Sequence, residues 1–200
     1  MLSDEQRQVR DAARKFAANE IAPFAAQWDR DNGAPRDIYR AMAAIGLMGV
    51  TIDPVYGGAG ADFVSYALAI EEISAADGGI SNVMAANNSP VGVALQNLGT
   101  DWQKQHYLTK LTSGEWIGCI QLTEPHTGSD AAAITTTAVR DGDNYVINGH
   151  KAFITAGATA DLAMIIAVTD PTAGKRGLTA FITPTNNIGY EVVRREQKLG

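Results

Sequence analysis

The stretch from Cys119 to Ala133 carries the residues best suited to bind a polar ligand. Its sequence, CIQLTEPHTGSDAAA, begins as an alternating apolar run typical of a buried strand. The run ends at Thr123-Glu124-Pro125, because a proline lacks the backbone donor that a strand needs. His126–Asp130 is a turn sequence whose free amides could bind a phosphate and whose hydroxyls could bind a polar ligand edge. On residue types alone, an ordinary β-turn with internal hydrogen bonds is the better interpretation.

A second stretch, Asn148–Gly157, reads NGHKAFITAG. Together the two stretches resemble the signatures T-E-P-x-x-G-S-D and N-G-x-K-x-W-I-T-x-G of the acyl-CoA dehydrogenases. Their order and spacing, and the pattern around them, agree with that family over essentially all 200 residues. One signature alone would be weak, whereas both in register are specific.

The resemblance implies which residues bind FAD. Ile120–Ser129 corresponds to the first flavin segment, where the backbone and the Thr123 hydroxyl would line the polar edge of the flavin. Ser129 matches the serine that contacts the FAD pyrophosphate near the CoA thioester, so it is also the predicted substrate-binding residue. In the second segment, the Thr155 hydroxyl would bond near flavin N5 and Phe153 would cover one flavin face. The predicted cofactor-binding residues are Ile120, Gln121, Leu122, Thr123, Gly128, Ser129, Phe153, Ile154 and Thr155.

Two residues of these segments depart from the family pattern. Phe153 replaces the usual tryptophan, so it can still stack on a ring but lacks the indole N–H. His126 stands where a small residue is commoner. Without the resemblance, Phe153 and Thr155 would be interpreted as ordinary strand residues and Glu124 as a surface carboxylate.

The reaction implied by the resemblance is the FAD-dependent α,β-dehydrogenation of an acyl-CoA thioester in fatty-acid or amino-acid catabolism. A base removes the α-proton while the β-hydrogen leaves as hydride, and hydrogen bonds to the thioester carbonyl stabilise the enolate-like charge. Asn87–Pro90 (NNSP) resembles a stretch of the short-chain members that borders their acyl pocket, which favours a short or short-branched substrate. The implied electron acceptor is an electron-transfer flavoprotein, and the intact enzyme is expected to be a homo-oligomer.

The family's C-terminal helical bundle has no counterpart in the 200 residues. In the family this bundle supplies the glutamate base and many of the FAD contacts. No Asp or Glu of this chain matches that base, so no catalytic residue is predicted. We therefore expect a truncated chain that folds, is inactive alone, and binds FAD weakly or not at all. Two alternatives stay open: an acyl-CoA oxidase or flavin monooxygenase of the same superfamily, and a non-catalytic fragment or partner subunit.

Composition argues against several other classes of protein. The formal net charge of −6 gives no basic surface for nucleic acid. One cysteine and three scattered histidines form no zinc-binding pattern, so no metal is predicted, and Cys119 is interpreted as a small core residue. No apolar run approaches the roughly 20 residues of a membrane span. The acidic N-terminus does not look like a signal peptide, and we expect a cytoplasmic protein.

Helices are expected to precede both segments. Apolar residues recur at helical spacing in the first half of the chain. Ser3–Gln6 and Thr100–Gln103 each form a capping box, Pro35 suits a first helical turn, and Asp62 suits an N-cap. One long helix is expected from Ile80 to Leu98.

Beyond Glu115 the apolar residues alternate and β-branched residues become frequent, which predicts strands. The expected strands are Ile134–Val139, Tyr145–Ile147, Phe153–Thr155, Leu162–Val168, Leu178–Ile182 and Tyr190–Val193. Helices followed by strands indicate an α+β chain: an all-helical domain at 1–114 and a small β-barrel or sheet domain at 115–200.

Overall fold

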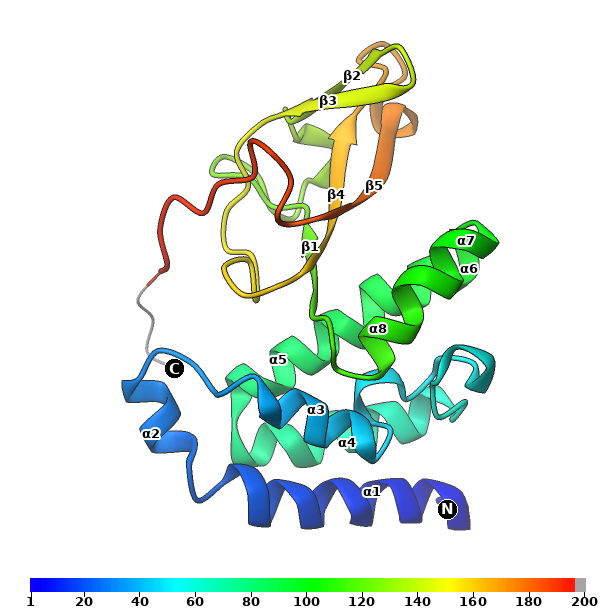
Figure 1. The fold of residues 1–200 in the computed structure, drawn as a ribbon, viewed down its shortest axis with the longest axis vertical. Coiled ribbons are helices and arrows are strands. Elements are labelled where there is room, and N and C mark those ends of the chain that lie inside the picture. The colour runs from blue at the N-terminus through cyan, green and yellow to red at the C-terminus, as the bar shows by residue number, and fades with distance from the viewer. Residues whose placement is uncertain (197–200) are drawn as a thin grey trace. The chain divides into compact units, whose positions relative to one another are not determined.

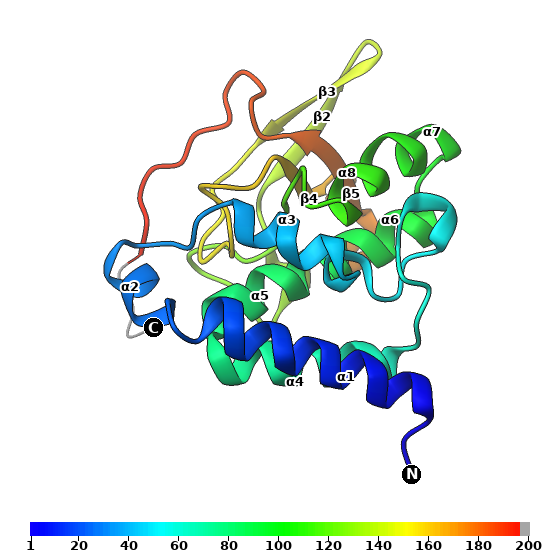
Figure 2. The same cartoon turned by 60° about the horizontal axis from the view of Figure 1, so that its bottom comes forward.

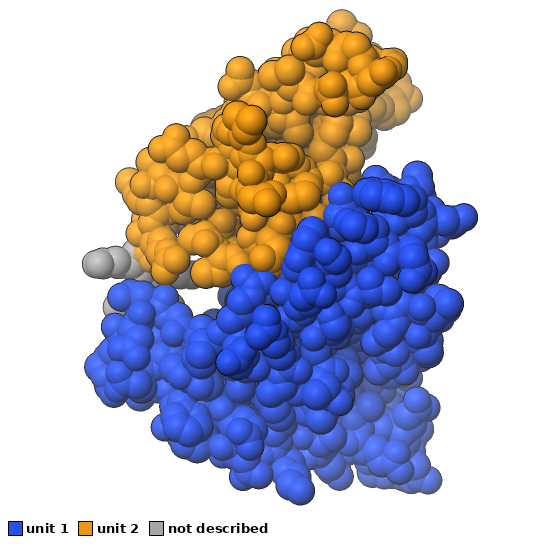
Figure 3. All heavy atoms as spheres, viewed as in Figure 1, with its two compact units in different colours: residues 1–117, 198–200 blue, residues 118–197 orange. Residues whose placement is uncertain are grey.

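The structure, a computed structural model, describes residues 1–196 as two compact units (Figure 3). The first unit comprises Met1–Ile117, and the second begins at Gly118. The first is helical and the second contains a small mixed sheet, which confirms the predicted α+β class. Within residues 1–196, no helix is both long enough and apolar enough to cross a membrane.

The first unit consists of helices joined by short turns (Figures 1 and 2). Helix α1 packs along α4, and Ala13, Ala17 and Ile21, which recur at helical spacing, are buried. The α-helices are α1 (Asp4–Phe16), α2 (Ala25–Arg30), α3 (Asp37–Ala44), α4 (Phe63–Ala76), α5 (Gly78–Ala86), α6 (Val93–Leu98), α7 (Asp101–Gln103) and α8 (Thr109–Thr112). Single π-helical turns lie at Ala17–Ile21, Asn87–Gly92 and Lys104–Leu108, and 3₁₀ turns at Leu47–Gly49 and Pro54–Tyr56.

The helix starts predicted at Ser3, Asp62 and Thr100 are confirmed, whereas Pro35 lies before the N-cap Arg36 of α3 and is not in its first turn. The Ser3 hydroxyl accepts a hydrogen bond from the Gln6 backbone amide, and the Gln6 side chain accepts one from the Ser3 backbone amide. Thr100 and Gln103 form the same pair of hydrogen bonds. Asp62 caps α4 through its carboxylate. Each cap satisfies backbone donors that the first helical turn leaves unpaired, so these starts are encoded locally.

The long helix predicted from Ile80 to Leu98 is wrong, because Asn87–Gly92 interrupts it. Ser89 has an extended backbone (φ −146°, ψ 121°), and Pro90 follows it. A proline in a helix interior removes one hydrogen bond and clashes with the preceding turn. The segment therefore divides into α5 and α6.

Asn87 and Asn88 at this interruption are buried and hold the backbone of an earlier turn. The Asn88 side chain accepts a hydrogen bond from the Val50 amide at 2.7 Å and donates one to the Leu47 carbonyl at 2.8 Å. Asn87 donates to the Met48 carbonyl at 3.0 Å. Since these amides are occupied by backbone, the short-chain interpretation of this stretch rests on the resemblance alone.

The second unit is a five-stranded sheet centred on β4 (Figure 1). Its strands are β1 (Gly118–Gln121), β2 (Thr137–Asp141), β3 (Asn144–Asn148), β4 (Leu162–Val168) and β5 (Leu178–Pro184). Strand β4 pairs in parallel with β1, from Gly118↔Leu162, and in antiparallel along its whole length with β5. The hairpin β2–β3 joins β4 through the single parallel pair Thr137↔Val168. Most of β4 is buried, so this strand forms the centre of the unit's core.

Most of the predicted strands exist. Leu162–Val168 is β4, Tyr145–Ile147 lies within β3, and Leu178–Ile182 lies within β5. The strand predicted at Ile134–Val139 begins later, at Thr137. The strands predicted at Phe153–Thr155 and Tyr190–Val193 are wrong, because both segments are irregular. Tyr190 makes side-chain contacts at the candidate site, and Phe153–Thr155 belongs to its second segment.

Candidate functional site

The structure brings the two stretches with candidate chemistry together within the second unit. The Ala152 amide donates to the Thr123 carbonyl at 2.9 Å. Twenty-nine positions after Leu122, Lys151 donates from Nζ to the Leu122 carbonyl at 3.1 Å. The same Nζ lies 2.9 Å from Glu124 Oε1. The end of the first segment therefore lies directly beside the start of the second.

Glu124 is the central side chain of this contact. Its side chain is only 2% exposed, so the interpretation as a surface carboxylate is wrong. Besides Lys151, the carboxylate accepts hydrogen bonds from the Thr135 amide and hydroxyl, each at 2.8 Å, and from the Thr136 amide at 2.9 Å. Burial by itself would raise the pKa of Glu124, but the hydrogen bonds from Thr136, Lys151 and Thr135 outweigh burial and hold that pKa far below its usual range.

Gly149 allows the second segment to come this close. A Cβ added to Gly149 would lie 2.1 Å from the Thr136 hydroxyl oxygen and 2.6 Å from its Cβ, so a larger residue would push the two apart. The glycine of the N-G-x-K pattern therefore serves close packing. It lets Lys151 reach the carboxylate that Thr136 also contacts.

After Glu124 the first segment reverses direction in a tight turn. The amides of Glu124 and Thr127 each donate to the other residue's carbonyl, at 2.9 and 3.1 Å. The Thr127 hydroxyl then donates to the Asp130 carbonyl at 2.6 Å. The turn thus has the internal hydrogen bonds of an ordinary β-turn. Gly128 and Ser129, which follow it, are exposed and accessible to a ligand.

The second segment continues past Ala152 as a turn. Phe153 and Ala156 have positive φ angles of 58° and 59°, which are uncommon for residues other than glycine. The contacts of Lys151 and Ala152 with the first segment take the place of strand pairing. Phe153 is 72% exposed, whereas Ile154 and Thr155 are half-buried. An exposed ring held on a constrained backbone is a suitable surface for stacking a planar ligand.

The strand residues of the first segment face more protein. Ile120, Leu122 and Thr123 are half-buried and Gln121 is buried. Gln121 Nε2 donates to the Tyr190 hydroxyl at 2.7 Å, and that hydroxyl donates to the Gly157 carbonyl at 3.0 Å. Tyr190 therefore contacts both segments, a position that the sequence analysis missed. Gln121 and Tyr190 are 69 positions apart, and no local pattern signals their contact.

The described residues fit a flavin with a phosphate-containing tail. Phe153 offers a ring face, Thr123 and Thr155 offer hydroxyls, and the exposed Gly128-Ser129 turn offers backbone amides. Among residues 1–196, no three His, Cys, Asp or Glu side chains come together as a possible metal site.

Comparison with protein families matches both units. The model of the acyl-CoA dehydrogenase N-terminal domain matches residues 3–115, and the model of the acyl-CoA dehydrogenase middle domain matches residues 119–200. Together the two models cover nearly the whole chain.

Individual proteins agree with this match. A short-chain specific acyl-CoA dehydrogenase of Clostridium acetobutylicum is 43% identical over 199 residues, covering 100% of this chain and 52% of that protein. A structure of an electron transferring flavoprotein of Acidaminococcus fermentans contains a chain with a TM-score of 0.90 at 38% identity, covering 94% of this chain and 50% of that chain. A glutaryl-CoA dehydrogenase from Mycobacterium smegmatis in complex with FADH2 gives a TM-score of 0.92 at 32% identity, covering 99% and 50%. The chain spans about half the length of the relatives it matches.

Proposed function

The chain belongs to the acyl-CoA dehydrogenase family, and we propose that it supplies flavin-binding residues to an enzyme that introduces an α,β double bond into an acyl-CoA thioester. The observation that carries this proposal is the direct pairing of the two signature segments through Ala152–Thr123 and Lys151–Glu124. FAD, when bound, supplies the acceptor for the substrate hydride. Because the chain spans half the length of its relatives, the proposed activity is that of a protein of their full length.

Each polar or aromatic group that could contact the flavin has a proposed role. Phe153 stacks on one flavin face, and the hydroxyls of Thr123 and Thr155 donate to polar atoms of the flavin edge, where they favour the charge of the reduced ring. Gly128 and Ser129 bind the pyrophosphate, and Ser129 also lies against the substrate thioester arm. The remaining proposed contacts, from Ile120 to Leu122 and at Ile154, come from the backbone.

The α-proton is removed by a residue outside these segments. Glu124 is the acidic side chain that contacts both segments, but both of its oxygens accept hydrogen bonds. Its pKa lies far below its usual range, which makes it a very weak base. Its geometry supports a structural role, as does the burial of its side chain.

The substrate and the partners follow from the relatives. A short acyl chain is supported by the short-chain specific relative from Clostridium acetobutylicum. An electron-transfer flavoprotein as acceptor is supported by the matching chain from Acidaminococcus fermentans. A homo-oligomeric assembly and a cytoplasmic location complete the proposal.

FAD binding to the chain is the first test. Titration of the chain into FAD, followed by flavin fluorescence, is expected to give weak saturable binding and little flavin retained after desalting. Riboflavin, which lacks the pyrophosphate, is the matched comparison and is expected to bind more weakly. Equal binding of FAD and riboflavin would count against the proposed role of Gly128 and Ser129.

The reaction is tested on a protein of the relatives' full length. Anaerobic addition of butyryl-CoA is expected to bleach the flavin absorbance, and an electron-transfer flavoprotein is expected to restore it faster than dissolved oxygen does. No bleaching with any short acyl-CoA would contradict the dehydrogenase. Rapid reoxidation by oxygen would instead indicate an acyl-CoA oxidase.

A further inference from the structure

The Tyr190 hydroxyl joins the two segments at a point separate from the Glu124–Lys151 pair. It accepts a hydrogen bond from Gln121 Nε2 at 2.7 Å and donates one to the Gly157 carbonyl at 3.0 Å. Gln121 ends β1, and Gly157 lies in the turn that follows Phe153 and Thr155. One hydroxyl therefore links the strand of the first segment to the turn of the second.

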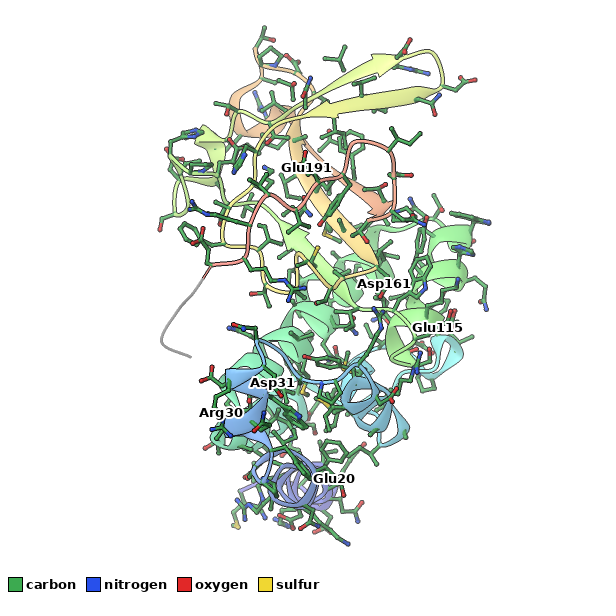
Figure 4. The ribbon with its side chains drawn as sticks, turned by 60° about the vertical axis from the view of Figure 1, so that its left-hand side comes forward. Glu20, Arg30, Asp31, Glu115, Asp161 and Glu191 are labelled. Carbon is green, nitrogen blue, oxygen red and sulfur yellow. The ribbon has the colours of Figure 1, made fainter. Side chains whose placement is uncertain are left out.

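The chain after β5 also contacts the loop before β4. The Thr185 amide donates to the Asp161 carbonyl at 3.0 Å, and the Thr185 hydroxyl donates to the Ala160 carbonyl at 2.6 Å; Asp161 is labelled in Figure 4. Gly189 has a φ of 86°, and the turn there closes with a hydrogen bond from the Tyr190 amide to the Asn187 carbonyl. The segment after β5 therefore contacts the chain at Gly157 through Tyr190, and at Ala160 and Asp161 through Thr185.

Only a protonated tyrosine can make both contacts at once. A phenol donates one hydrogen bond and accepts others, whereas a phenolate only accepts. Burial raises the pKa of Tyr190 to about 12, and the neighbouring Cys119 adds to the shift. The hydroxyl therefore keeps its proton, and the direction of both hydrogen bonds is fixed.

We propose that Tyr190 is a positioning residue that fixes the 154–160 turn against the end of β1 and thereby sets the separation of the two flavin-contacting segments. This role rests on the proposed function. It acts through Gln121 and Gly157 and requires no contact between Tyr190 and the flavin. A flavin that touches both segments would bind best when that separation is constant, because binding then orders less of the protein.

The test compares two substitutions in the same returning segment. Tyr190→Phe keeps the ring and removes only the bridging hydroxyl. Thr185→Val removes a hydroxyl that contacts the same loop, at Ala160, but does not reach the first segment. Amide hydrogen exchange of residues 154–160 and the dissociation constant for FAD are measured on the 200-residue chain, with thermal stability recorded for each variant.

Tyr190→Phe is expected to raise both the exchange rate at 154–160 and the FAD dissociation constant by about tenfold, the effect of losing one to two hydrogen bonds. Thr185→Val is expected to lower thermal stability without changing the FAD dissociation constant. Gln121→Met is expected to change the exchange rate and the FAD dissociation constant as much as Tyr190→Phe does. The double variant should add little to either change, because both substitutions break the same Gln121–Tyr190–Gly157 link.

Two results would overturn the role of Tyr190. One is unchanged exchange at 154–160 in Tyr190→Phe. The other is an FAD effect that Thr185→Val shares in proportion to its loss of stability. If the unmodified chain binds no FAD, the dissociation constants are compared on a protein of the relatives' full length, whose failure to bind FAD would count against the proposed function. The exchange measurement on the 200-residue chain then decides alone whether Tyr190 fixes the turn.

Discussion

Removing the ammonium group of Lys151 should destabilise the second unit strongly. In Lys151→Met the aliphatic stem stays, but Glu124 loses the positive charge 2.9 Å from its Oε1. The two side chains are 7% and 2% exposed, so water cannot replace the lost partner without opening the structure. Breaking a buried ion pair by removing one partner costs about 3–5 kcal/mol. We expect the lower end, about 3 kcal/mol, because the donors from Thr135 and Thr136 remain.

The pH dependence of the free energy of unfolding tests whether the Glu124 carboxylate contributes to stability. The pKa of Glu124 is lowered in the folded chain from its ordinary value of 4.5. Its contribution to the free energy of unfolding is therefore complete above pH 4.5 and is lost as the pH falls from there toward the folded-state pKa. Glu124→Gln should flatten this acid-side decline. It should also cost stability at neutral pH, because its amide N–H₂ must face groups that donate.

The assay needs a probe of each unit. Trp28, Trp102 and Trp116 all lie in the first unit, so tryptophan fluorescence follows that unit, whereas amide exchange in β4 follows the second. Lys175→Met, at an exposed lysine of the second unit, is the matched control and should cost less than about 0.5 kcal/mol. A loss below about 1 kcal/mol in Lys151→Met would refute the reasoning, because the pair would then behave as a surface ion pair.

Two further substitutions separate structural residues from ligand-binding ones. Asn88→Leu should cost about 3 kcal/mol in urea unfolding followed by tryptophan fluorescence, because it leaves the Val50 amide and the Leu47 carbonyl buried without their partner; a change below about 1 kcal/mol would contradict that assignment. Phe153→Gly should leave thermal stability unchanged or raise it by up to about 1 kcal/mol, because glycine accepts a positive φ and the ring is exposed. The same variant should weaken FAD binding about tenfold, and unchanged affinity would argue against stacking on this ring.

Local signals predicted the helical part well. Ser3, Asp62 and Thr100 begin helices because each cap depends only on residues up to three positions away. The interruption at Asn87–Gly92 was missed, although Pro90 lies inside the apolar run. The buried contacts of Asn87 and Asn88 were missed too, because their partners at Leu47–Val50 are distant in sequence.

The conformation of the candidate site could not be predicted in full, because it depends on long-range contacts that a single sequence does not reveal. The β-branched and aromatic residues of Phe153–Thr155 favour a strand, but the pairing of Lys151 and Ala152 with the first segment imposes a turn. Tyrosine is a residue type that favours strands, but the Tyr190 hydroxyl instead donates a hydrogen bond to the Gly157 carbonyl. The resemblance singled out the two segments. The direct contacts between them became visible only in three dimensions.

The parallel pairing of β1 with β4 has a consequence for the order of folding. Apart from the residues of β1 itself, both candidate segments and the β2–β3 hairpin lie in the connection between these two strands. Parallel partners cannot meet through a local turn, so the unit has a high contact order and the chain must close this long loop before the central strand is paired on both sides. The ligand-contacting surface is thus assembled in the same late step as the sheet. A ligand that engages both segments should accelerate that step, and its presence during refolding should raise the yield more than its addition afterwards.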